Sequence, residues 1–115
     1  MNNKELQAAR KLLMLDVSEA AEHVGGVSAR SWQYWEGRRS PVPDDVADEM
    51  QSLLRMRRDM IAEVREQAAG KRFSLRYFNS LAEFVNAHPD GTVRGWRLHQ
   101  SVAAHYYAGG KIALE

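Results

Sequence analysis

The chain has 115 residues, a formal net charge of +1, 44% hydrophobic residues and 27% charged residues, which is typical of one small globular domain or of such a domain with a dimerisation extension. It contains no cysteine, and this excludes disulfides, thiol catalysis and thiolate metal sites while fitting a reducing compartment. No apolar run is long enough for a membrane span and the polar N-terminus lacks a signal core, so we expect a cytoplasmic protein with no membrane partner.

The first predicted helix extends from about Lys4 to Met14, with Asn3 as its cap. Apolar residues recur in it at helical spacing and predict one buried stripe, formed by Leu6, Ala9, Leu12 and Leu13. The basic residues of this helix are expected on its solvated face, namely Lys4, Arg10 and Lys11.

A pair of short helices is predicted between Val17 and Glu36. Gly25 and Gly26 supply a tight turn between them, because glycine adopts positive φ without steric cost. Ser28 can accept from the free N–H groups that open the second helix. Small or apolar residues occupy the positions at which the helices must pack, namely Val17, Ala20, Ala21, Val24, Val27, Trp32 and Trp35. This pattern predicts a helix-turn-helix.

The second helix of this pair is left with polar side chains on its outward face. Arginine and glutamine are suited to the guanine and adenine edges of a major groove, so the pattern predicts a nucleic-acid ligand. The candidate contacts are Ser28, Ala29, Arg30, Gln33 and Tyr34 on the helix, with Arg38 and Arg39 in the following loop as phosphate contacts.

Several of these residues also have a plainer interpretation. Arg30 can be a solvated arginine that pairs with Glu36 or another acid, and Ser28 can be a helix cap only. Tyr34 can touch a thymine methyl or a sugar, stack on an unpaired RNA base, or flank the core. Arg38 and Arg39 can be free surface arginines.

The second helix is expected to end at Gly37 in a left-handed conformation, and two nearby prolines predict a loop after it. A long helix is predicted from about Asp44 to Ala69, because carboxylates favour the positive end of the helix dipole. Arg57 interrupts the apolar stripe of this helix, which predicts a bend or a change of packing partner there.

The remaining residues alternate and then return to helical spacing. Residues 71–78 predict a single strand, whose open edges we expect to pair with the same strand of a second subunit. Two further helices are predicted, from Ser80 to about Ala87 and from about Val93 to Tyr107. The expected dimer interface comprises Phe73, Leu75, Tyr77, Trp96, Val102 and Tyr106.

The sequence therefore predicts a mainly α fold. Residues 1–69 are expected to form a helix-turn-helix DNA-binding domain that includes the long helix at 44–69. Residues 70–115 are expected to form a small α+β dimerisation region with one strand. We expect neither an enzyme nor a cofactor, because the four histidines lack metal-ligand spacing and no nucleophile, base and acid can be nominated.

Four stretches carry a resemblance to a known family. The run "EAAEHVG" followed by "VSARSWQYWEGRRSPVP" resembles the helix-turn-helix of lambda-repressor-like regulators, with a turn one residue longer than usual. The stretches "KELQAARKLLMLDVSEAAEHVG", "LRYFNSLAEF" and "GWRLHQSVAAHYY" extend the likeness over most of the chain. Together they resemble the second group of anti-CRISPR-associated repressors.

That resemblance implies a homodimer from a phage or mobile element, acting in a bacterial host. Such proteins bind inverted repeats in the promoter of an anti-CRISPR operon and repress it together with their own gene. The group is also linked to repression through messenger RNA. By the resemblance, Arg30 and its neighbours carry over as nucleic-acid contacts.

Two other functions stay open from the sequence. The same face can grip a stem-loop in a transcript, in which case RNA is the target. Alternatively, the chain can be an antitoxin-like interaction module that masks a partner protein with its tail. If the second helix of the helix-turn-helix from each of two subunits enters successive major grooves of a DNA site, the two helices should be about 34 Å apart.

Overall fold

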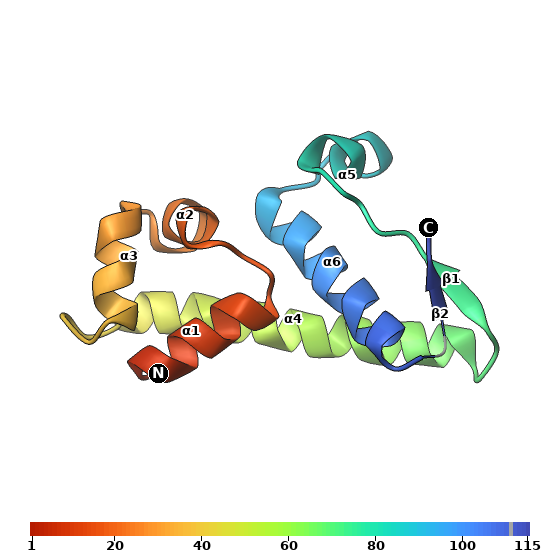
Figure 1. The fold of residues 1–115 in the computed structure, drawn as a ribbon, viewed down its shortest axis with the longest axis horizontal. Coiled ribbons are helices and arrows are strands. Elements are labelled where there is room, and N and C mark those ends of the chain that lie inside the picture. Colours follow the sequence, from red (N-terminus) through yellow and green to blue (C-terminus); the bar gives the residue numbers. More distant parts are fainter. Residues whose placement is uncertain (111) are drawn as a thin grey trace. The chain divides into compact units, whose positions relative to one another are not determined.

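The structure of the protein, a computed structural model, describes residues 1–110 and 112–115. These residues are mainly helical, as the sequence predicts, and they include one small sheet (Figure 1). In chain order the elements are α1 (Asn3–Leu12), α2 (Val17–Ala20), η1 (Ala21–Gly25), α3 (Ala29–Glu36), α4 (Asp44–Ala68), β1 (Phe73–Leu75), α5 (Leu81–Ala87), α6 (Val93–Ala108) and β2 (Ile112–Leu114). In the part of the chain so described, every helix is too short or too polar to cross a membrane.

The chain divides into two compact units, Met1–Arg55 and Met56–Glu115. The division lies within α4, close to Arg57, where the apolar stripe of the sequence is interrupted. In the second unit, Arg57 is half-buried and its Nε donates to Ser101 Oγ of α6 at 3.3 Å. The expected division between a DNA-binding domain and a dimerisation region, at residues 69 and 70, is a functional one and stays a prediction.

Helix α1 begins one residue earlier than the sequence analysis expects. Asn2, not Asn3, is the cap, because its side chain accepts from the Glu5 N–H while the Glu5 carboxylate accepts from the Asn2 N–H, both at 2.8 Å. This reciprocal box requires an acid three residues after the cap, and only Asn2 has Glu5 at that distance. Leu12 was wrongly placed in the buried stripe: it is 48% exposed, since a helical step of about 100° separates it from the buried Leu13.

The turn between α2 and α3 is built from η1, a π-helical turn, followed by Gly26. The Ala21 carbonyl accepts from the backbone N–H groups of Gly26 and Val27, and the latter bond is 3.0 Å long. A π turn holds one residue more than an α turn, so it accommodates the longer turn. Gly26 has the expected positive φ, at +62°. Gly25 serves packing instead, because a Cβ there would lie 3.2 Å from the rings of both Trp32 and Trp35.

The end of α3 differs from the prediction at one residue. Gly37 has φ −90° and is not left-handed, and the positive φ of +66° belongs to Arg38. The Arg39 N–H then donates to the Tyr34 carbonyl at 2.9 Å, which closes the helix as a Schellman turn. This closure requires the left-handed residue two positions beyond the last helical residue, and that position is Arg38 rather than Gly37.

In the second unit, an aromatic cluster joins α5 and α6 to the segment before α5. Phe78, Phe84 and Trp96 are its buried members. The Phe78 carbonyl accepts from the indole of Trp96 and from the amide of Gln100, each at 2.8 Å. Gln100 is therefore buried with its polar group satisfied.

The tail strand pairs within the chain, contrary to the expectation that it needs a second subunit. Strand β1 lies parallel to β2, with Phe73 opposite Ile112 and Leu75 opposite Leu114. Glu115 continues the ladder, because its N–H donates to Leu75 and its carbonyl accepts from Tyr77, each at 2.9 Å. The sequence analysis missed β2 because three residues are too few to reveal an alternating pattern.

Candidate nucleic-acid interface

Helix α3 has one buried side and one exposed side. Trp32 is fully buried and Trp35 is 8% exposed, with their ring centroids 5.4 Å apart. This confirms the prediction that both tryptophans belong to the core. Arg30 and Gln33 are exposed, as the sequence analysis requires of residues that meet a ligand outside the protein. The buried tryptophans thus fix which side of α3 faces solvent.

Ser28 caps the N-terminal end of α3, as predicted. The Ser28 hydroxyl accepts from the Ser31 N–H at 3.2 Å and also lies 3.2 Å from the Ser31 hydroxyl. Ser28 is exposed and Ala29 is half-buried, so the first turn of α3 is open to solvent. Such an end suits an anion, because its N–H groups and the helix dipole both favour negative charge.

Tyr34 contacts two arginines. The Arg30 Nε donates to the Tyr34 hydroxyl at 2.7 Å, and its guanidinium carbon lies 5.5 Å from the centre of the Tyr34 ring. The guanidinium carbon of Arg39 lies 5.5 Å from the same ring centre. The structure therefore brings together three of the predicted site residues, and Arg30 is not paired with Glu36 as its plainer interpretation supposed.

Arg38 is held by the start of α1. Its Nε donates to Asn3 Oδ1 at 3.0 Å, while Asn3 Nδ2 donates to the Glu36 carbonyl at 3.1 Å. One amide thus joins the N-terminal end of α1 to the residues that end α3. Arg38 and Arg39 remain exposed, on the rim of a hollow that Trp35 and Pro41 also line.

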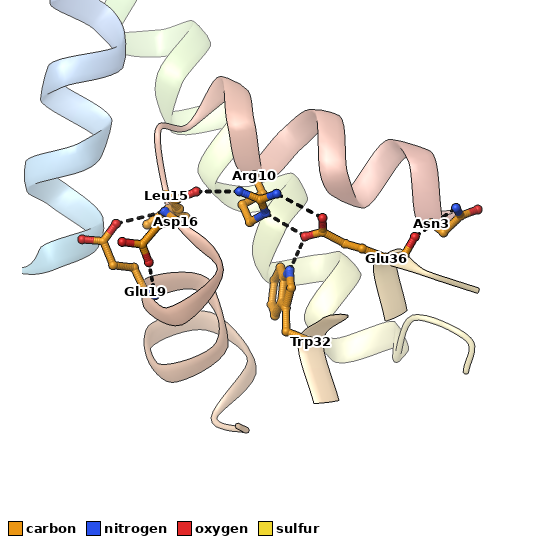
Figure 2. A network of polar contacts seen from close by, with 7 residues as sticks. All are labelled: Asn3, Arg10, Leu15, Asp16, Glu19, Trp32 and Glu36. Carbon is orange, nitrogen blue, oxygen red and sulfur yellow. Dashed lines mark hydrogen bonds and ion pairs between the residues drawn. The ribbon is translucent and has the colours of Figure 1, made fainter. Parts of the chain in front are cut away.

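The residue that the sequence analysis missed is Arg10. It is not on a solvated face: only 11% of its side chain is exposed, and it pairs with Glu36, whose side chain is 8% exposed. Arg10 Nε donates to Glu36 Oε2 at 2.7 Å, Nη2 donates to Oε1 at 3.1 Å, and Nη1 donates to the Leu15 carbonyl at 3.1 Å (Figure 2). The signal was its spacing, because Arg10 follows Leu6 by four residues and precedes Leu13 by three on the buried side of α1.

Glu36 is the centre of this polar network. It also accepts from the indole N–H of Trp32 (Figure 2). Burial alone would raise the pKa of Glu36, but the hydrogen bonds from Arg10 and Trp32 and the positive charge of Arg10 outweigh burial and hold the pKa below its ordinary value of 4.5. Glu36 is thus held ionised, and it fixes the last turn of α3 to α1.

The residues of the expected dimer interface fall into two groups. Trp96 and Val102 are buried by the chain's own packing. The others are half-buried: Phe73, Leu75, Tyr77 and Tyr106. Phe73 packs edge-on against Tyr106 at a centroid distance of 5.6 Å, and Tyr106 donates its hydroxyl to the Ile61 carbonyl. The interface itself stays a prediction.

The histidine and acidic side chains of the described residues are spread over the fold. Among residues 1–110 and 112–115, no three side chains of His, Asp or Glu lie where they could hold one ion.

Comparison with known protein families covers nearly the whole chain. The model of the Aca2/YdiL-like family matches residues 1–114. The chain belongs to the Aca2/YdiL-like family. One member, the Aca2 repressor of Pectobacterium phage ZF40, is 60% identical over 115 residues, which cover 99% of each chain. Another, the uncharacterized protein YdiL of Escherichia coli K12, is 30% identical over 111 residues and 94% of each chain. Membership of the Aca2/YdiL-like family confirms the resemblance to anti-CRISPR-associated repressors.

Proposed function

We propose that this chain is a dimeric transcriptional repressor that reads an inverted-repeat operator with α3. In this proposal the operator lies in the promoter of an anti-CRISPR operon that includes the repressor's own gene. The observation that carries it is the exposed position of Arg30 and Gln33 on a helix whose other side is held by two buried tryptophans. The 60% identity to a protein named Aca2 repressor supports the same function.

Base recognition is assigned to Arg30 and Gln33. They are three residues apart and both exposed, so they project from neighbouring positions of one helix surface. Arginine can donate two bonds to guanine O6 and N7, and glutamine can pair with the N6 and N7 of adenine. These two residues are therefore the source of sequence preference in this proposal.

Phosphate contacts are assigned to both ends of α3. Ser28 and the half-buried Ala29 present the open first turn, and Arg38 and Arg39 lie exposed beyond the last turn. Such contacts fix the register of a helix on the duplex without selecting its sequence. They predict an affinity that falls with salt concentration, since each neutralised phosphate releases counterions.

The direct test is binding to the DNA immediately upstream of the gene. The expected loss for Arg30→Ala is about 1–3 kcal/mol of specific binding free energy, measured by fluorescence anisotropy on operator and scrambled duplexes. Arg55→Ala is the matched control, because Arg55 is also exposed and its loss removes the same charge from a different helix. A folded Arg30→Ala protein with unchanged operator affinity would refute this assignment.

A dimer is proposed because an inverted repeat presents two equivalent half-sites. Two copies of α3 must then be about 34 Å apart, or a multiple of this, to enter successive major grooves on one side of the duplex. The half-buried residues Phe73, Leu75, Tyr77 and Tyr106 are the surface proposed for the contact between copies. Sedimentation equilibrium should give twice the mass of the chain, and a monomer that binds one half-site would contradict the dimer.

Messenger RNA is proposed as a second ligand of the same surface. The observation that favours it is the partly exposed ring of Tyr34 with the guanidinium groups of Arg30 and Arg39 near it. Aromatic rings and guanidinium planes are the groups on which unpaired RNA bases stack. Affinities for a matched DNA duplex and an RNA hairpin from the same transcript should both fall in Arg30→Ala. A stable complex with a neighbouring gene product, without affinity for either nucleic acid, would favour the antitoxin-like alternative.

A further inference from the structure

Tyr34 on α3 contacts two arginines, Arg30 on the same helix and Arg39 in the loop that follows it. Arg30 and Tyr34 are four residues apart, so their side chains meet on one side of the helix. The 2.7 Å distance from Arg30 Nε to the Tyr34 hydroxyl is at the short end of the range for N–H···O bonds. Tyr34 is half-buried, while both arginines are exposed. Tyr34 is thus a partly buried contact for two exposed guanidinium groups.

The atom that Tyr34 engages determines what Arg30 can still do. A guanidinium carries five N–H donors, one on Nε and four on the two terminal nitrogens. The hydroxyl of Tyr34 accepts only the Nε–H, so within the described residues the terminal nitrogens of Arg30 make no hydrogen bond to the protein. Those nitrogens are the pair that can donate together to guanine O6 and N7.

Arg10 provides the contrast within the same unit. Its Nε, Nη1 and Nη2 all donate to protein acceptors, two of them to the Glu36 carboxylate. Each of the three nitrogens of the Arg10 guanidinium is therefore engaged inside the protein. Arg30 is held at one atom and open at the other two, which is the arrangement expected of an arginine prepared for an external ligand.

We propose that Tyr34 is a positioning residue for operator DNA: it orients Arg30 through its hydroxyl and supports Arg39 through its ring, and it acts on recognition of the operator bases through Arg30 rather than by touching them. This inference rests on the proposed function of α3. The physical advantage is entropic, because an arginine loses rotamer freedom when it is immobilised. Part of that ordering is completed when α3 folds, before nucleic acid arrives.

The first experiment is a double-mutant cycle on operator DNA. Tyr34→Phe removes the hydroxyl and keeps the ring, so we expect operator affinity to fall about three- to tenfold, the range for one side chain that must be ordered on binding. Affinity for scrambled DNA should change little, because Arg39 keeps its aromatic support. In an Arg30→Ala background, Tyr34→Phe should have no further effect. Tyr107→Phe is the matched control, since Tyr107 is 60% exposed on α6.

A third variant separates the ring from the hydroxyl. Tyr34→Leu removes both, so it should lower operator affinity at least as much as Tyr34→Phe and should also weaken binding to scrambled DNA. The salt dependence of binding should become shallower at the same time, because Arg39 then contributes less to phosphate contact. Circular dichroism should first establish that each variant retains the helical content of the wild-type chain.

Two outcomes of the cycle overturn the inference. If Tyr34→Phe binds operator as tightly as the wild type, the hydroxyl does not position Arg30 for recognition. If Tyr34→Phe costs the same in the wild-type and Arg30→Ala backgrounds, Tyr34 contacts nucleic acid itself. A wild-type protein that does not prefer operator over scrambled DNA would instead contradict the proposed function.

A measurement without nucleic acid tests the contact separately. The Nε–H proton of Arg30 should exchange with water more slowly than that of Arg55 in an NMR experiment on the free protein, and Tyr34→Phe should abolish the difference. Equal exchange at Arg30 and Arg55 in the wild type overturns the positioning role, whatever the protein binds.

Discussion

Arg10 and Glu36 form a two-point ion pair between α1 and the last residue of α3, at 2.7 Å and 3.1 Å. Glu36 also accepts from the indole of Trp32, so one carboxylate orients both the helix end and the buried ring beside it. These contacts hold the buried side of α3, and they therefore also determine the direction of its exposed side, which carries Arg30. In the proposed function, the position of the nucleic-acid-binding surface thus depends on a buried charge pair on the other side of the helix.

Removing Arg10 should therefore destabilise the fold more than the loss of an arginine on a solvated face would. We expect Arg10→Ala to lower the free energy of unfolding by about 3 kcal/mol, because it leaves a buried carboxylate without its charge partner. Urea unfolding measures the change. Lys11→Ala is the matched control, since Lys11 is exposed on the same helix, and an equal loss in the two variants would contradict this account.

The pH dependence of stability should report the same pair. The pKa of Glu36 is lower in the folded chain than its ordinary value of 4.5, so its contribution is complete above about that pH and is lost as pH falls through the folded pKa. Urea unfolding at neutral pH and in steps below pH 4.5 should show the loss. Glu36→Gln keeps an acceptor for Trp32 but cannot titrate, so its stability should fall less steeply over this acid range.

The two glycines of the turn should respond differently to alanine. Gly25→Ala places a methyl group 3.2 Å from both Trp32 and Trp35, and we expect a loss of about 1–3 kcal/mol from overpacking. Gly26→Ala meets no atom within 4 Å, but its φ of +62° costs an L-residue about 1–2 kcal/mol. Thermal unfolding, together with near-ultraviolet circular dichroism of the tryptophans, distinguishes the two. A tryptophan signal altered by Gly26→Ala and not by Gly25→Ala would reverse this assignment.

The second unit should lose stability in mild acid. His99 lies 4.9 Å from the Phe84 ring and 5.2 Å from the His88 ring, measured between centroids. Burial, and then the charge of His88, lower the pKa of His99 below its ordinary value of 6.5. The unfolded chain therefore binds a proton at His99 more readily than the folded chain does. The free energy of unfolding should be unaffected by His99 above pH 6.5 and should fall as the pH drops from 6.5 to the pKa of His99 in the folded chain.

Amide hydrogen exchange in α6 is the measurement for this prediction, because it reports on the second unit alone. His99→Gln should flatten the dependence below pH 6.5. His23→Gln, in the first unit, is the control and should leave it unchanged. Protection factors in α6, corrected for the intrinsic pH dependence of exchange, that are the same on both sides of pH 6.5 in the wild type would count against the role of His99.

The C-terminal strand should protect β1 from other chains. Removing residues 112–115 takes away the ladder that begins with Phe73 opposite Ile112, and β1 is then left with both edges open. We expect the truncated protein to associate in a concentration-dependent manner, as measured by sedimentation velocity. Ala113→Ser keeps the backbone ladder and should behave as the wild type does. A truncated chain whose association matches that of the wild type would show that β2 is not what covers this edge.

Much of α3 was predictable from the sequence, because the determining interactions are local. Ser28 caps the helix through a residue three positions away, and Gly26 adopts a positive φ because it has no Cβ. The spacing of Trp32 and Trp35 identifies the buried side, and this leaves Arg30 and Gln33 exposed. Each of these predictions uses residues within about one turn of each other, where stereochemistry alone decides the result.

Only the tertiary structure decided which distant residues become partners. Arg10 meets Glu36 because α1 packs against α3, and β1 meets β2 because the chain returns to it after α6. Such pairs join residues far apart in sequence, and their proximity results from the burial of apolar faces elsewhere in the fold. An amphipathic stripe shows that a face will be covered, but the polar group at its edge finds its partner only when the covering helix is in place.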